Sequence, residues 1–371
     1  MVQLAGLEPL VAALRAAGYR VIGPTVASDA IGLAELTSAA ELPAGWGVEL
    51  APGGYRLRRR ADQARFGHAA GPQSWKAHLH PAHQPVLTVE RDAAGQVSFT
   101  GPAGEPPRYA FLGVRPCDLR AIGVQDRVLG GPGSRYAARR AAALVIAVNC
   151  TEPGATCFCA ATGSGPGAGE GADLVLTELV GGPGREPAYL AEAATPAGRA
   201  LLAGVPHRPA EPARVAAGQE QVAAAADRMG RTLPAADLRS LLAGAHDAAR
   251  WDDVAQRCLT CGNCTMACPT CFCVTAEDST DLTGDHAQRW QRWASCFEPD
   301  FSYLHGGPVR ESGRSRYRQW LTHKFGTWHD QFGESGCVGC GRCIVWCPVG
   351  IDVTEELHAL AAERDAKEAA P

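Results

Sequence analysis

The hydrophobic positions in the first half of the chain alternate between helical spacing and short continuous runs. Leucines at three- and four-residue steps predict an amphipathic helix over residues 4–17, and the apolar stretch at 19–26 follows as a strand. Further apolar runs predict buried strands over residues 108–114, 140–150 and 172–179. Because strands alternate with helical patterns, this part of the chain is predicted to be a mixed α/β domain.

The pattern changes after about residue 210, where the chain becomes rich in alanine. Helical spacing is clear over residues 217–230 and 235–257, and again in the charged stretch 352–368 near the end of the chain. Cysteines crowd the part between these helices. We therefore expect two domains: a mixed α/β domain over residues 1–245, and a helical two-cluster ferredoxin-like domain over residues 246–371.

Composition narrows the class of protein. The 371 residues carry a net charge of −4, so no overall basic field favours nucleic acid. No apolar run approaches the roughly 18 residues that a membrane helix needs, and the first residues lack the basic stretch of a signal peptide. The fifteen cysteines are odd in number and closely spaced, which is atypical of a secreted disulfide scaffold. These features predict a cytoplasmic metalloprotein with no membrane or nucleic-acid partner.

The cysteines form two copies of one motif, C-x2-C-x2-C-x3-C followed by proline, which is typical of two-cluster ferredoxins. In that motif three cysteines hold one [4Fe–4S] cluster and the fourth reaches the other cluster. The crossed assignment gives the first cluster Cys258, Cys261, Cys264 and Cys347, and the second cluster Cys337, Cys340, Cys343 and Cys268. Structural zinc is the alternative, but zinc sites do not need a third cysteine at this spacing or a fourth before proline.

A long insertion separates the two motifs, with 68 residues between Cys268 and Cys337. It contains a basic, tryptophan-bearing stretch at residues 310–329. This stretch could cover the clusters and offset their negative charge, or it could dock to an acidic partner subunit. We favour the first interpretation, because charged runs are usually solvated faces of a fold.

Seven cysteines lie outside the two motifs. Four of them fall near predicted strand ends of the first domain and form a candidate third iron–sulfur site: Cys117, Cys150, Cys157 and Cys159. Cys117 follows Pro116 at a predicted helix start, where the helix dipole favours a thiolate, and Asp118 is an alternative oxygen ligand. The other three, Cys271, Cys273 and Cys296, are expected to pack beside the clusters. No nucleophile–base pair or nucleotide loop is recognisable in the sequence. We therefore expect this chain to have no catalytic residue of its own.

Several stretches resemble one known family: 111–122, 149–166, 173–179, 261–273, 316–325 and 336–352. They look like the beta subunit of soluble NAD(P)-linked nickel–iron hydrogenases of the sulfhydrogenase type, and the corresponding iron–sulfur subunit of anaerobic sulfite reductase is similar. The resemblance implies an electron-relay subunit between a flavin subunit that handles NAD(P)H and the small subunit of a hydrogenase. The flavin and the nickel site are then expected on partners, and the expected cofactors here are two [4Fe–4S] clusters with a candidate third.

Two alternatives to this function stay open at the level of sequence. The same relay would serve an anaerobic sulfite reductase. The first domain is also large for an adapter, so a self-contained flavin-dependent iron–sulfur oxidoreductase is the other alternative.

Overall fold

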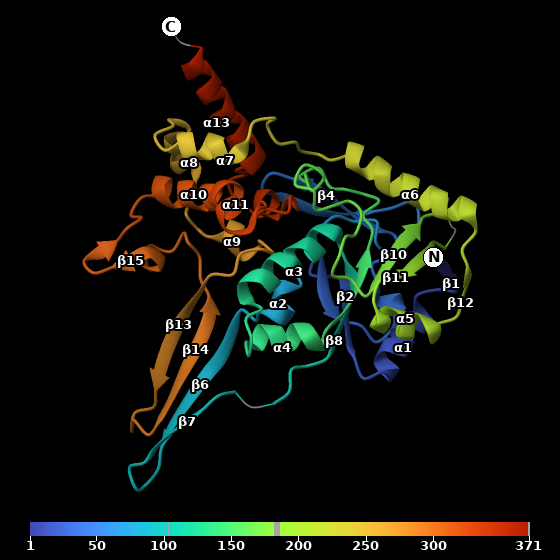
Figure 1. Ribbon diagram of the computed structural model, residues 1–371, viewed down its shortest axis with the longest axis horizontal. Coiled ribbons are helices and arrows are strands. Elements are labelled where there is room, and N and C mark those ends of the chain that lie inside the picture. The colour runs from blue at the N-terminus through green and yellow to red at the C-terminus, as the bar shows by residue number, and fades with distance from the viewer. Residues whose placement is uncertain (103, 182–185, 370–371) are drawn as a thin grey trace.

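An eight-stranded sheet forms the centre of the N-terminal part of the molecule (Figure 1). The computed structural model describes residues 1–102, 104–181 and 186–369. The strands of the sheet are β1 (Val2–Leu4), β2 (Arg20–Ala27), β3 (Ala30–Glu35), β8 (Tyr109–Val114), β9 (Leu144–Val148), β10 (Leu174–Leu179), β11 (Ala188–Ala193) and β12 (His207–Pro209). Their order is β12-β1-β11-β10-β9-β8-β2-β3, with parallel pairing from β10 to β2 and antiparallel pairing outside. The mixed α/β class is thus confirmed.

Helices cover both faces of this sheet. They are α1 (Glu8–Ala16), α2 (Lys76–Leu79), α3 (Pro116–Leu129), α4 (Arg135–Ala142), α5 (Pro196–Ala203) and α6 (Pro212–Asp227). Along β9, Leu144, Ile146 and Val148 share a buried cluster with α1, whereas Val145 and Ala147 share one with α3 and α4. Because side chains alternate between the two faces of a strand, this one short apolar strand contributes to the hydrophobic clusters on both faces of the sheet.

Two predicted boundaries in this part were wrong. The first helix begins at Glu8 rather than residue 4, because Leu4 belongs to β1 and pairs with Tyr189 of β11. The strand predicted over 140–150 is shorter, since α4 continues to Ala142 before β9 begins. In both places a single apolar run is shared between two elements, which periodicity does not resolve.

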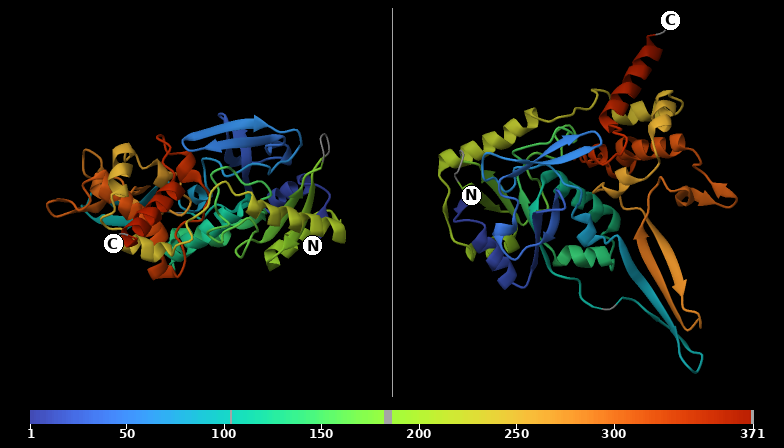
Figure 2. Two further views of the ribbon diagram at one scale, coloured as in Figure 1. Left: turned by 90° about the horizontal axis from the view of Figure 1, so that it is seen from above. Right: turned by 180° about the vertical axis from the view of Figure 1, so that it is seen from behind.

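A four-stranded antiparallel sheet projects from the body as an arm (Figures 1 and 2). Its strands are β6 (His83–Arg91), β7 (Val97–Thr100), β13 (Val274–Thr280) and β14 (His286–Trp293), in the order β13-β14-β6-β7. Half of the arm comes from the first predicted domain and half from the insertion between the cysteine motifs. The division at residue 245 stays a prediction, and this sheet joins segments from both sides of it.

The cysteine motifs lie among helices in the C-terminal part, most of them short. These are α7 (Leu238–Gly244), α8 (Arg250–Arg257), α9 (Asn263–Met266), α10 (Gly313–Thr322), η3 (His323–Thr327), α11 (Trp328–Phe332), α12 (Arg342–Val345) and α13 (Val353–Glu368). The strands here are the arm strands β13 and β14 and the small hairpin β15 (Tyr303–Leu304) and β16 (Gly307–Pro308). Trp251, Trp320, Phe325 and Leu357 belong to one buried cluster, which Phe158 from the first part of the chain completes.

A second hairpin, β4 (Trp46–Ala51) and β5 (Gly54–Arg59), lies over the junction between the two parts. The Gly53 backbone nitrogen in its turn donates to the carbonyl oxygen of Ile344 in α12 at 3.0 Å. Tyr55 stacks on Trp346, with ring centroids 5.5 Å apart. The hairpin therefore fastens the α/β part to the second cysteine motif. Among the described residues, no helix is both long enough and apolar enough to cross a membrane.

A core substitution should measure how much the α1 face contributes to stability. Leu14 is fully buried between α1 and the sheet, so Leu14→Ala should lower the free energy of unfolding by about 2–5 kcal/mol. Leu282 at the tip of the arm is fully exposed. Leu282→Ala should therefore change the free energy of unfolding by less than about 0.5 kcal/mol. Urea unfolding followed by circular dichroism compares the two. Equal losses would contradict this packing of α1.

Candidate iron–sulfur sites

The cysteines of the crossed assignment gather around two cavities. The first cavity is lined by Cys258, Cys261, Cys264 and Cys347, and Cys343 of the second motif also lines it. The second cavity is lined by Cys268, Cys337, Cys340 and Cys343. Each cavity thus brings together three cysteines of one motif and the fourth cysteine of the other, as the spacing predicts. The assignment of ligands remains a prediction, and the placement of the side chains agrees with it.

The two cavities are neighbours with a common wall. Cys343, Trp320 and Val353 line both of them. Trp320 belongs to α10 in the insertion, so the basic stretch at 310–329 does cover the cluster sites. This placement supports the first interpretation of that stretch.

The residues around the first cavity fit an iron–sulfur cluster. Tyr317 and Trp320 line it, and the Tyr317 hydroxyl and Trp320 Nε1 are buried with no hydrogen-bond partner among the described atoms. Buried donors of this kind are costly unless an acceptor reaches them, and thiolate and inorganic sulfide are such acceptors. Gly262 and Gly341 adopt positive φ angles of 77° and 74° and begin α9 and α12, which turns the chain tightly between successive cysteines.

Burial controls the protonation of these thiols. It raises the pKa of Cys337 to about 12 and the pKa of Cys264 well above its usual value. Cys268 differs: a hydrogen bond from the Cys271 thiol lowers its pKa, and the nearby Lys324 ammonium acts in the same direction. Metal must therefore displace protons from most of these cysteines, and binding should weaken as the pH falls.

A loop of the α/β part holds the second motif in place. The backbone nitrogen of Phe158 donates to the Gly339 carbonyl oxygen at 2.8 Å, and the Ser164 hydroxyl donates to the Val338 carbonyl oxygen at 2.7 Å. The approach is so close that a side chain on Gly341 would lie 2.4 Å from the Thr156 carbonyl oxygen. The glycines of the second motif are thus required by packing against this loop as well as by their φ angles.

A buried ion pair makes a second connection between the two parts. Arg342 of α12 donates to both carboxylate oxygens of Asp118 in α3, at 2.7 and 3.0 Å, and both side chains are almost fully buried. Its guanidinium also donates to the carbonyl oxygens of Gly71 and Gln73. Asp118, proposed as an alternative ligand, is therefore engaged by Arg342.

The structure places the four first-domain cysteines close to the second cavity. Cys117 lies at the start of α3 as predicted, and it shares a buried cluster with Cys159 and Cys340. Cys157 lies in the adjoining cluster, with its sulfur 3.9 Å from the Cys340 carbonyl oxygen. Cys150 follows β9 and is less buried than the other three. Among the described residues, no three metal-binding side chains are close enough to hold a single ion.

The expectation that the helix dipole favours a Cys117 thiolate was wrong for this structure. Burial raises the pKa of Cys117 well above its usual value, and the adjacent Asp118 carboxylate acts in the same direction. Burial also raises the pKa of Cys157 and Cys159 to about 12. Desolvation outweighs the dipole here because the first turn of α3 is enclosed by the second motif.

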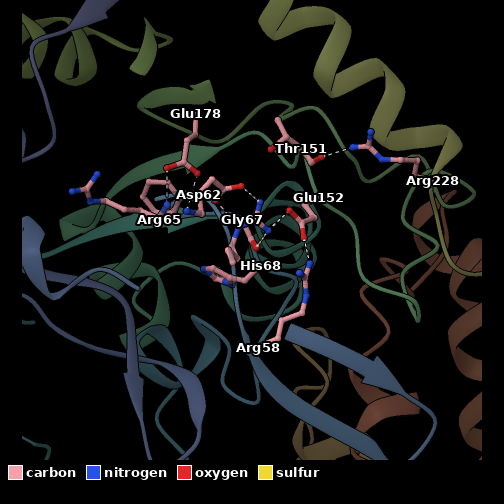
Figure 3. A network of polar contacts seen from close by, with 12 residues as sticks. Arg58, Asp62, Arg65, Gly67, His68, Thr151, Glu152, Glu178 and Arg228 are labelled. Carbon is pink, nitrogen blue, oxygen red and sulfur yellow. Dashed lines mark hydrogen bonds and ion pairs between the residues drawn. The ribbon is translucent and has the colours of Figure 1, made fainter. Parts of the chain in front are cut away.

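A polar network fixes the loop that carries these cysteines (Figure 3). Glu152 accepts hydrogen bonds from Arg58, at 2.7 Å, and from Arg60. Arg228, directly after α6, donates to the Thr151 carbonyl oxygen at 2.6 Å. Nearby, the buried Glu178 carboxylate accepts from two backbone nitrogens of the 65–66 segment. The loop after Cys150 is therefore held from β5 on one side and α6 on the other.

The three remaining cysteines lie beside the cluster cavities. Cys271 is next to Cys268, and Cys273 is near Cys296. None of the three is among the residues that line either cavity. Their position is the one expected for packing residues, and a ligand role is not required to explain it.

Comparison with known proteins identifies the family. Residues 257–351 match the 4Fe-4S dicluster domain. Over 255 residues the chain is 31% identical to sulfhydrogenase 2 subunit beta of Pyrococcus furiosus, which covers 66% of this chain and 72% of that protein. The chain belongs to the family of sulfhydrogenase beta subunits. The family expected from the sequence motifs is thereby confirmed. No solved structure shows significant similarity to this member of the family.

Sequence reasoning missed the residues that the insertion contributes to the cavities. Tyr317, Trp320 and Lys324 line them, and they follow one another at steps of three and four residues. That spacing places all three on one face of a helix. The signal was present in the sequence, but a stretch rich in arginine gives no indication of which of its faces is buried.

A pair of glycine substitutions tests the packing of the second motif. Gly341→Ala and Gly333→Ala both place a side chain at a φ above 70°, but only Gly341 has backbone atoms in the way. Gly333→Ala should therefore cost only about 1–2 kcal/mol and leave the iron content unchanged. Gly341→Ala should displace the loop and reduce the iron bound per chain. Equal iron contents in the two variants would contradict this contact.

Proposed function

We propose that this chain is an iron–sulfur electron-transfer subunit, which relays electrons between a flavin subunit that uses NAD(P)H and the small subunit of a cytoplasmic nickel–iron hydrogenase. The observation that carries the proposal is the pair of cysteine-lined cavities with a common wall at Trp320 and Cys343. Electron transfer falls off steeply with distance, so adjoining centres are suited to a relay. The name of the relative, sulfhydrogenase 2 subunit beta, favours a hydrogenase over a sulfite reductase.

Each cavity would hold one [4Fe–4S] cluster, and such a cluster supplies one-electron transfer when bound. Cys258, Cys261, Cys264 and Cys347 would be the ligands in the first cavity. Cys268, Cys337, Cys340 and Cys343 would be the ligands in the second. Apolar side chains such as Phe297 and Phe158 line the cavities and exclude water from the centres. Catalysis, the flavin and nickel are assigned to partner subunits.

We also infer a third centre held by Cys117, Cys150, Cys157 and Cys159. Support comes from their placement against the second motif, where Cys117 and Cys159 pack with Cys340. A centre here would extend the relay from the 246–371 domain into the 1–245 domain. The second cavity would then be the middle station of three.

Substitution of Cys268, the fourth cysteine of the first motif, gives the sharpest test of the crossed ligand assignment. Cys268→Ala should remove the cluster held by Cys337, Cys340 and Cys343, although it lies in the other motif. Cys271→Ala is the matched control, because this thiol is a near neighbour of Cys268 but does not line the cavity. Electron paramagnetic resonance of reduced protein distinguishes the clusters. Loss of the first cluster alone in Cys268→Ala would disprove the crossed assignment.

The same variant tests the relay in the assembled complex. With Cys268→Ala, hydrogen-dependent reduction of NAD(P) should fall at least about tenfold, because the path through this chain is broken. Hydrogen oxidation with an artificial dye that reacts at the hydrogenase subunits should be retained. Unchanged NAD(P) reduction would show that electrons bypass this subunit.

The third centre has its own test. Cys157→Ser combined with Cys159→Ser should remove about four irons per chain while both ferredoxin-type signals persist, if these residues are ligands. Serine is close to cysteine in size, so a packing role predicts little change in the fold. Iron content and rate of electron transfer equal to those of the unchanged protein would reduce these residues to packing.

A further inference from the structure

The two cavities differ in charge. The residues that line the first cavity are apolar, neutral or cysteine, and its polar side chains are the uncharged Asn263, Tyr317 and Trp320. The second cavity is lined by similar residues with one exception, Lys324. This lysine comes from η3, the turn of π-helix between α10 and α11. A π-helical turn projects its side chains in directions that a regular helix cannot, and such turns are common at functional sites.

Lys324 is buried without a carboxylate partner. Lys324 is only 4% exposed, and its Nζ donates to the Thr270 hydroxyl at 2.7 Å. Thr270 in turn donates to the Gly336 carbonyl oxygen at 2.8 Å and lies 3.2 Å from the Cys268 sulfur. No aspartate or glutamate among the described residues forms an ion pair with this lysine. An ammonium enclosed in this way is strongly destabilising unless an anion lies close to it.

The anion that fits is the cluster itself. Four thiolates and a [4Fe–4S] core together carry net negative charge, and reduction adds one more electron to it. The lining of the second cavity contains those four cysteines and Lys324 but no carboxylate. The burial of the lysine, which is otherwise unexplained, is therefore accounted for by a negative group in the cavity.

We propose that Lys324 raises the reduction potential of the second cluster above that of the first. A fixed positive charge stabilises the more negative, reduced state, and it does so strongly where little water screens it. The inference rests on the proposed relay function. An electron that leaves the first cluster is accepted by the second. Because the second cluster would have the higher reduction potential, a single electron shared by the two clusters would reside mainly on the second. Lys324 is a tuning residue and takes no part in bond making.

A second buried lysine provides the control. Lys76 of α2 is 5% exposed; its Nζ donates to the Cys271 carbonyl oxygen at 3.1 Å and lies 3.7 Å from the centre of the Trp293 ring. Like Lys324 it has no described carboxylate partner and approaches the Cys268–Cys273 segment. It does not line either cavity. Lys76→Met therefore removes the same charge from a similar environment, but from a position outside the lining of the cavity.

Redox titration of the full chain, followed by electron paramagnetic resonance, tests the proposal. The signal of the second cluster is identified as the one that Cys268→Ala removes. At a fixed potential, Lys324→Met should lower the ratio of reduced to oxidised second cluster at least about tenfold, which is about 59 mV for a one-electron couple. The ratio for the first cluster should change less. Lys324→Arg should keep the original ratio within about threefold, and Lys76→Met should change it less than Lys324→Met does.

Each outcome decides the question. An unchanged ratio in Lys324→Met, with both signals present, would overturn the role of Lys324 but leave the relay intact. Absence of both cluster signals from the unchanged protein would instead overturn the proposed function. If Lys324→Met and Lys324→Gln lose the second cluster while Lys324→Arg retains it at a potential above that of the first cluster, the positive charge is needed to hold the cluster and the proposal stands; retention at a potential equal to or below that of the first cluster would overturn it. Loss in all three variants would assign Lys324 to packing and contradict the proposal.

Discussion

The rest of the structure depends on the meeting of two cysteine loops that are 68 residues apart in the chain. Cysteines of both loops line each cavity. In the crossed assignment each loop supplies three ligands to one cluster and a fourth to the other, so neither cluster would be complete unless both loops are in place. The intervening residues are consequently folded back over the cavities, with Trp320 at their common wall. Metal binding and folding are expected to be coupled in such an arrangement.

The α/β part contributes to this arrangement as a support. The loop 156–164 hydrogen-bonds to the second motif, and Asp118 pairs with Arg342 inside the interface. The hairpin β4–β5 contacts the second motif from another side, through the hydrogen bond from Gly53 to Ile344 and the stacking of Tyr55 on Trp346. The second motif is therefore enclosed by the first part of the chain, whereas Cys261 of the first motif is exposed. The second cavity, beside the more enclosed motif, is also the one that a charged residue, Lys324, lines.

How far the sequence predicts this molecule depends on the range of the interactions. The cysteine spacing is local, so both ligand sets could be proposed from it, and the apolar runs predicted the buried strands β8, β9 and β10. The pairing of β6 with β14 could not be predicted, because the partners are about 200 residues apart in the chain. The same is true of Lys324. A lysine in a basic stretch is expected to be solvent-exposed, and only the tertiary fold buries it.

The central claim is that the two cavities hold iron–sulfur clusters that this chain assembles jointly. Iron and acid-labile sulfide, measured on anaerobically purified full-length protein, test it most directly. The account predicts equal amounts of the two: about eight of each per chain for two clusters, or about twelve with the third centre. Zinc without sulfide, at one or two ions per chain, would contradict it and leave the cysteine loops as structural metal sites.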